Sequence, residues 1–232
     1  MTRHPAARRL HHAPVADDDA FVARVLNLAV WAKAHARALG IGAAILVLAA
    51  AAGLYYVNYQ RSVRTLAATE LNQVRQTALS GNNALAIRDL EAFITRFSST
   101  DAADEARLLL ARTYLDDGQA QKAIEAIQPL AGRIRTPMGA SAAFLLAAAY
   151  EAAQDLDKAV ATYAALADQA PTSLDRQEAL QQAARIRMDR GDAAAAAELY
   201  ERLVNSAGQG TPERALFEMR LAEARAVAAR RD

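Results

Sequence analysis

The sequence contains no cysteine, and its four histidines all lie within the first 35 residues. Disulfide bonds, thiolate metal sites and cysteine nucleophiles are therefore excluded. The rest of the chain also lacks histidine, the commonest general base and zinc ligand. Only two lysines, Lys122 and Lys158, follow Lys33. We therefore expect no catalytic residue, no metal site and no cofactor, and we expect that the protein is not an enzyme.

The formal net charge of +1 conceals a difference between the two ends of the chain. Residues 1–37 hold six lysines and arginines against three aspartates, a balance of +3, so the remaining residues sum to −2. A nucleic-acid-binding domain usually shows a clustered basic face. The nearly neutral C-terminal part therefore gives no reason to expect nucleic acid as a partner, and nothing in it indicates a small-molecule substrate.

Residues 38–60 carry no charge and lie between Arg37 and Arg61, and the part from 39 to 57 is almost entirely apolar. A helix rises about 1.5 Å per residue and the hydrocarbon core of a bilayer is about 30 Å thick, so about twenty such residues can cross it. The apolar stretch is too long, and too far from the N-terminus, for a cleaved signal peptide. It therefore predicts a single transmembrane helix that acts as a signal anchor.

The residues before this stretch divide into two parts. Residues 1–19 combine prolines, arginines and histidines without an apolar period, which predicts a disordered basic tail. Residues 20–37 carry apolar side chains at helical spacing, namely Phe21, Val25, Leu28 and Trp31. This spacing predicts an amphipathic juxtamembrane helix at the membrane surface, although a simple helical lead-in to the anchor explains it equally well.

The basic residues on the two flanks indicate the orientation of the anchor. Six lysines and arginines precede the apolar stretch, whereas three arginines follow it within about 18 residues. The excess predicts a cytoplasmic N-terminus and an extracytoplasmic C-terminal domain over residues 61–232. In a bacterium this is a single-pass protein of the inner membrane whose C-terminal domain is periplasmic.

The C-terminal domain contains an internal repeat. Four alanines recur at intervals of 37, 36 and 37 residues, at Ala86, Ala123, Ala159 and Ala196. A turn glycine lies five residues before three of them, and Gln154 takes this place in the third copy. Four residues after each alanine comes a large apolar residue: Leu90, Ile127, Tyr163 or Tyr200. The helix before each turn carries a small residue at a matching place: Ala111, Ala147 or Ala184.

This pattern resembles the tetratricopeptide repeat (TPR), in which small residues at fixed positions let paired helices approach closely. The resemblance covers about residues 66–207, with a period longer than the usual 34 residues. It implies an all-α fold, in which the anchor is followed by a TPR-like α-solenoid of about four helix pairs. Residues 212–230 are expected to form a C-terminal cap helix that covers the last repeat with Leu216, Phe217, Met219 and Leu221.

The TPR resemblance also implies a groove lined by the first helix of each pair. The position after the small residue holds arginine in three of four repeats. Together with the positions one turn away, the candidate partner-binding residues are Leu71, Arg75, Leu108, Arg112, Phe144, Glu151, Gln181 and Arg185. The arginines suit the carboxylates and carbonyls of a polypeptide, while Leu108 and Phe144 suit its apolar side chains. Alternatively, the arginines pair with neighbouring carboxylates such as Glu70, Glu105 or Glu178 and serve only solvation.

The order of these segments resembles the YfgM-type family of bacterial inner-membrane proteins. The shared features are a short charged lead-in, a span rich in glycine and alanine that ends in GLYYVNYQ, and repeats that begin directly afterwards. The resemblance implies a membrane-tethered scaffold that binds proteins or polypeptide segments, with the Sec translocon and periplasmic chaperones as partners. The alternative is a structural scaffold of an envelope complex, such as outer-membrane assembly, pilus or secretion machinery, that binds a folded partner.

Overall fold

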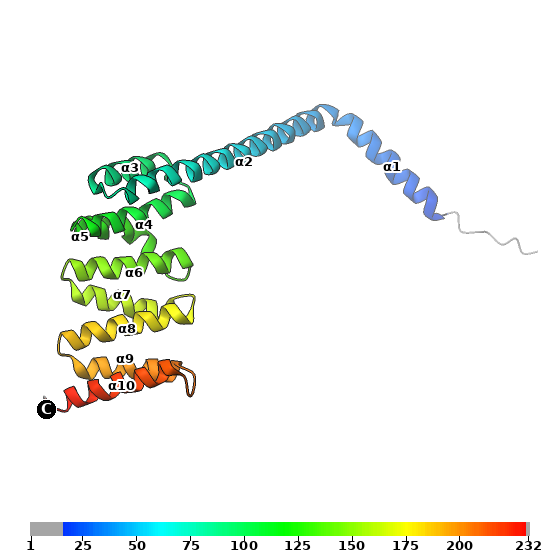
Figure 1. Ribbon diagram of the computed structural model, residues 1–232. Helices are drawn as coiled ribbons and strands as arrows, with labels where there is room; N and C mark the ends of the chain where they lie inside the picture. Colours follow the sequence, from blue (N-terminus) through cyan, green and yellow to red (C-terminus); the bar gives the residue numbers. More distant parts are fainter. Residues whose placement is uncertain (1–15, 231–232) are drawn as a thin grey trace, which may run out of the picture. The chain divides into compact units, whose positions relative to one another are not determined.

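The computed structural model describes residues 16–230, and these residues form ten α-helices and no strand (Figure 1). The predicted all-α class is confirmed. The predicted disorder of residues 1–15 lies outside the described part of the chain. The chain divides into two compact units, residues 1–60 and 61–232.

The first unit holds α1 (Ala16–Ala34) and the beginning of α2 (Ala36–Leu79). Helix α1 begins at Ala16, so residues 16–19, which were assigned to the basic tail, are helical.

The apolar side chains of α1 do not gather on one face. Leu26 and Val30 project from one side of the helix, and Leu28 and Trp31 project from the other, because successive residues are about 100° apart. All four side chains are exposed. These four side chains therefore leave no continuous polar face on the part of α1 that they cover, and the two interpretations of residues 20–37 stay predictions.

Helix α2 is 44 residues long and contains the whole predicted span, residues 38–60. Among the described residues it is the one helix that is long and apolar enough to cross a membrane, and its apolar part is not buried against other parts of the protein. The same helix continues without a break to Leu79, so a single element holds both the apolar segment and the first helix of the repeat domain.

The second unit is a stack of helix pairs (Figure 1). We call the first helix of each pair an A helix and the second a B helix. The A helices are α2 from residue 61 onward, α4 (Asp101–Asp116), α6 (Pro137–Ala152) and α8 (Ser173–Asp189). The B helices are α3 (Asn83–Arg96), α5 (Ala120–Ala131), α7 (Leu156–Gln169) and α9 (Ala193–Ser206). A last helix, α10 (Pro212–Ala228), packs on α9.

The residues at the repeat positions are buried, as their spacing predicts. The four register alanines are completely buried, as are the small alanines of the A helices α4, α6 and α8. The large residue four positions after each register alanine is also buried, from Leu90 in α3 to Tyr200 in α9. Both the small and the large residues of the repeat pattern thus lie in the interior of the stack. The predicted four pairs with a terminal helix are confirmed.

The terminal helix differs from the prediction in one detail. In α10, Phe217 and Leu221 are buried on the stack, but Leu216 and Met219 are 46% and 57% exposed. Only one face of the helix can contact α9, so half of the expected cap residues remain in solvent.

Candidate functional site

Shallow cavities follow the A helices. Two of them adjoin each other near the start of the stack and share Arg75 and Glu105. The first, of about 330 Å³, lies between α2 and α4, and the second, of about 340 Å³, is lined by α2, α4 and α6. We call these two cavities together the N-terminal section. A third cavity, of about 510 Å³, lies between α8 and α10, and we call it the C-terminal section.

The N-terminal section contains four of the predicted residues: Leu71, Arg75, Leu108 and Arg112. Leu71 is buried and Leu108 is half-buried, whereas the two arginines are exposed. The structure adds apolar and polar residues that the repeat pattern did not single out, namely Leu109, Ser141 and Leu145. Leu109 follows the predicted Leu108, and Leu145 follows the predicted Phe144. A prediction that also included the next residue along each helix would therefore have contained both leucines.

The C-terminal section contains Gln181 and Arg185 of the predicted set. Its opposite wall comes from α10, through residues such as Phe217, Arg220 and Glu223. The sequence analysis treated α10 only as a cap and therefore missed this wall. Because α10 packs on α9 as the next layer, it borders the cavity and does not fill it.

Phe144 and Glu151 line neither section, and both contact Tyr163 of α7. The Phe144 ring packs against Tyr163 with 6.1 Å between ring centroids. Glu151 accepts a hydrogen bond of 2.9 Å from the Tyr163 hydroxyl and also pairs with Arg185. Burial and the adjacent Glu151 carboxylate raise the pKa of Tyr163 above its usual range. The eight predicted residues are thus divided between two sections with a packed cluster between them.

The three predicted groove arginines have different surroundings. Arg75 pairs with Glu105 at 2.9 Å. Arg185 pairs with Glu151 and lies 3.4 Å from Asp189, and its hydrogen bond to Glu151 raises its pKa. Within residues 16–230, Arg112 forms neither an ion pair nor a hydrogen bond through its side chain. The interpretation that these arginines pair with nearby carboxylates therefore holds for two of the three positions.

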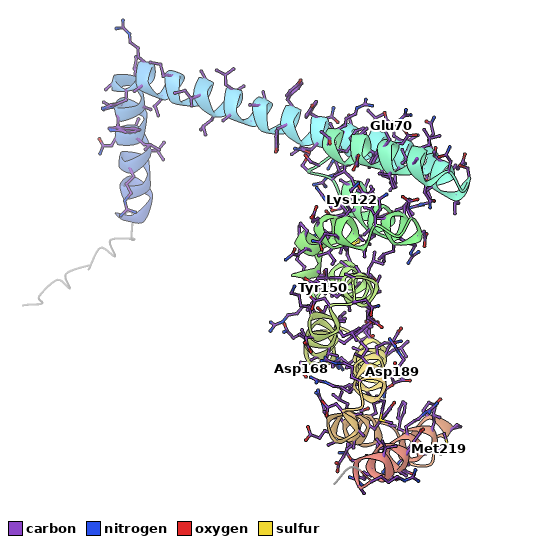
Figure 2. The ribbon with its side chains drawn as sticks, turned by 90° about the vertical axis from the view of Figure 1, so that its left-hand side faces the viewer. Glu70, Lys122, Tyr150, Asp168, Asp189 and Met219 are labelled. Atoms are coloured by element: carbon purple, nitrogen blue, oxygen red, sulfur yellow. The ribbon has the colours of Figure 1, made fainter. Side chains whose placement is uncertain are left out.

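Other arginines of the stack connect helices within one pair or in adjacent pairs. Arg96 at the end of α3 pairs with Glu70 of α2, which is labelled in Figure 2. Asp168, also labelled there, pairs with Arg202 of α9. Each of these pairs involves a B helix, and none of the four residues lines either section. The cavities themselves offer guanidinium donors, amides and leucine side chains, which are groups that bind polypeptides.

Helix pairs that cross at small residues and present their A helices along a common face define a TPR-like α-solenoid. The family model described as tetratricopeptide repeat-like domain matches residues 30–162, more than half of the chain, and the chain belongs to this family. The fold indicates a scaffold for protein–protein interaction, and proteins of this class are generally non-catalytic.

Solved structures show the same fold. Two crystal structures of TPR-like repeats from a Podosopora anserina kinesin light chain, one of them a variant with a single substitution, each superpose with a TM-score of 0.55. They are 21% and 22% identical in sequence, and each match covers 70% of this chain and 87% or 86% of the other. At this level of identity the likeness concerns the fold alone. No curated protein matches the sequence.

Proposed function

We propose that the protein is a membrane-tethered TPR scaffold whose repeat domain binds polypeptides on the extracytoplasmic side of a bacterial inner membrane. In this proposal it assists newly translocated proteins near the Sec translocon and periplasmic chaperones. The observation that carries the proposal is α2, a single helix that contains both the apolar segment and the A helix of the first repeat. A tether of this kind holds a binding surface at high effective concentration beside an emerging chain.

Two observations support the membrane anchor. The large apolar side chains of α2 between residues 39 and 57 are exposed, which is costly in water and favourable in lipid. The match to the family model covers residues 30–162, so it includes the apolar segment together with the first two repeats and most of the third. The orientation rests on the excess of lysine and arginine before the span.

The orientation is testable by cysteine labelling, because the chain has no cysteine of its own. Thr2→Cys and Ser99→Cys place one thiol before and one thiol after the span, and Ser99 is exposed. We expect a membrane-impermeant maleimide to label the Ser99→Cys protein in intact spheroplasts. The Thr2→Cys protein should react only after permeabilisation. The reverse pattern would show that the repeat domain is cytoplasmic and would refute the proposed location.

The partners are testable by photo-crosslinking in cells. A photoreactive amino acid at Ser141 lies in the N-terminal section, and one at Arg88 lies on the exposed surface of α3 as a matched control. We expect crosslinks from position 141, but not from position 88, to translocon subunits and to many different exported chains. Crosslinks to a single folded envelope protein would favour the alternative scaffold function.

A further inference from the structure

The strongest unexplained feature of the cavities is Arg112 of α4. It is exposed, it lines the cavity between α2, α4 and α6, and it forms no ion pair in the described part of the chain. The equivalent arginines in the first and last repeats, Arg75 and Arg185, are both paired. Arg112 therefore differs from its repeat equivalents in lacking a carboxylate partner.

The repeat positions explain this difference. Arg75 takes its carboxylate from Glu105, 30 residues later, and the residue 30 positions after Arg112 is Ala142. Ala142 is completely buried, so a carboxylate there would be placed inside the core. Arg185 takes its carboxylate from Glu151, 34 residues earlier, and the residue 34 positions before Arg112 is Ala78. Both positions that provide a partner elsewhere hold alanine here.

The surroundings of Arg112 are apolar on one side and basic overall. Leu108, Leu109 and Leu145 line the same cavity and are half-buried. The only other charged groups that line it are Arg75 and Glu105, which neutralise each other. The cavity therefore carries one uncompensated positive charge beside leucine side chains.

We infer that this cavity binds an acidic residue of a polypeptide next to an apolar one, with Arg112 receiving the carboxylate and the three leucines contacting the apolar side chain. The carboxylate of the ligand pairs with Arg112 as Glu105 pairs with Arg75 and as Glu151 pairs with Arg185. This inference rests on the proposed function, since it names the polypeptide chemistry that the scaffold selects. Guanidinium–carboxylate contacts are stronger than neutral hydrogen bonds, so the acidic residue gives the site its selectivity.

The test uses the full-length protein in lipid nanodiscs and fluorescein-labelled decapeptides with a glycine–serine background. One peptide has a central Glu-Leu pair, and the matched peptides have Gln-Leu or Glu-Ser instead. We expect fluorescence anisotropy to show that each replacement weakens binding by about fivefold. Arg112→Gln should weaken the Glu-Leu peptide by the same factor and leave the Gln-Leu peptide unchanged.

Two further variants make the result specific. Arg88→Gln removes one exposed positive charge outside the cavities and should leave binding unchanged. Ala78→Glu places a carboxylate where Glu151 stands relative to Arg185, so it should occupy Arg112 and weaken the Glu-Leu peptide by about fivefold. If Arg112→Gln leaves the binding of the Glu-Leu peptide unchanged, or if no peptide binds, the inference is wrong. The proposed scaffold function would then still be judged separately, by labelling and crosslinking.

Discussion

At the scale of single residues, the turn between A and B helices places one backbone position in the left-handed region. Glycine occupies this position at Gly81, Gly118 and Gly191, with φ between 72° and 80°. Gln154 occupies it in the third repeat, with φ of 61°. A residue with a Cβ atom is strained there by about 1–2 kcal/mol, whereas glycine is not. The backbone of the turn at Gln154 is therefore strained, whereas the corresponding turns that contain glycine are not.

The variant Gln154→Gly should relieve this strain. We expect the free energy of unfolding to rise by about 0.5–1 kcal/mol, because the gain is reduced by the larger entropy of glycine in the unfolded chain. Urea denaturation followed by circular dichroism measures the difference. The opposite change, Gly118→Ala, should lower stability by about 1 kcal/mol. Destabilisation by Gln154→Gly would show that the side chain contributes more than its backbone costs.

Gly139, in the first turn of α6, is constrained by space. A Cβ atom at this position would come within 1.9 Å of the Arg133 carbonyl oxygen, which belongs to the preceding turn. We expect Gly139→Ala to force the backbone apart and to lower the free energy of unfolding by about 1–3 kcal/mol. Gly132→Ala is a matched control from the same connection, because nothing lies within 4 Å of its Cβ position and its φ is −63°. An equal effect of both substitutions would contradict this explanation.

The spacing of residues in the sequence correctly predicted which small residues are buried. It did not predict which side chains from separate helices contact each other. The register alanines and the turn glycines follow from backbone geometry, which repeats with the sequence period. The pairing of Arg185 with Glu151, or the packing of Phe144 on Tyr163, depends on where side chains from separate helices meet. A single sequence does not contain that information, so the predicted groove included two residues that line no described cavity.

At the scale of helices, the N-termini repeat as regularly as the core positions. The helices α4, α6, α8 and α10 each begin after a threonine whose hydroxyl accepts a hydrogen bond from a backbone N–H of the first turn, at Thr100, Thr136, Thr172 and Thr211. The B helices begin after a polar residue in the same role, at Asn82, Asp155 and Asp192. Gln119, before α5, is the exception and forms no such bond.

The variant Gln119→Asn should supply the missing cap of α5. The shorter amide can accept a bond from the backbone N–H three residues later, as Asn82 does before α3. We expect an increase of about 0.5–1 kcal/mol in the free energy of unfolding, measured by thermal and urea denaturation. Asn82→Ala is the reciprocal control and should cost about 1 kcal/mol. No gain from Gln119→Asn would mean that the turn before α5 cannot bring the amide to the helix.

Helix boundaries show which elements a sequence predicts and which it does not. The register segment expected at residues 120–131 is α5 itself, because a turn glycine and the repeat period fix its position. Helix α1 begins at Ala16, four residues before the expected bound at residue 20, and no repeat period or turn glycine marks that boundary in the sequence. The capping threonines were visible in the sequence at spacings of 36, 36 and 39 residues, and they would have predicted the starts of α4, α6, α8 and α10.

At the scale of the whole repeat domain, each helix interacts with its neighbours in the stack. Ion pairs connect adjacent layers, such as Arg133 with Asp104 and Arg225 with Glu201, and no described pair skips over a repeat. In such a stack the stability is close to a sum of repeat and nearest-neighbour terms. The stability of the last repeat therefore depends on α10, which packs on α9 and buries Phe217, Leu221 and Ala224.

This dependence predicts a local effect of Phe217→Ala. Removing a buried phenylalanine costs about 3–5 kcal/mol when a whole domain must unfold, but a terminal helix can detach before the rest of the stack does. We therefore expect hydrogen exchange to accelerate in α10 and α9, while α4 to α6 keep their protection. Met219→Ala, at an exposed position of the same helix, should leave exchange unchanged. Equal acceleration along the whole stack after Phe217→Ala would show that the repeats unfold as one cooperative unit, and that the C-terminal section cannot open independently of the N-terminal section.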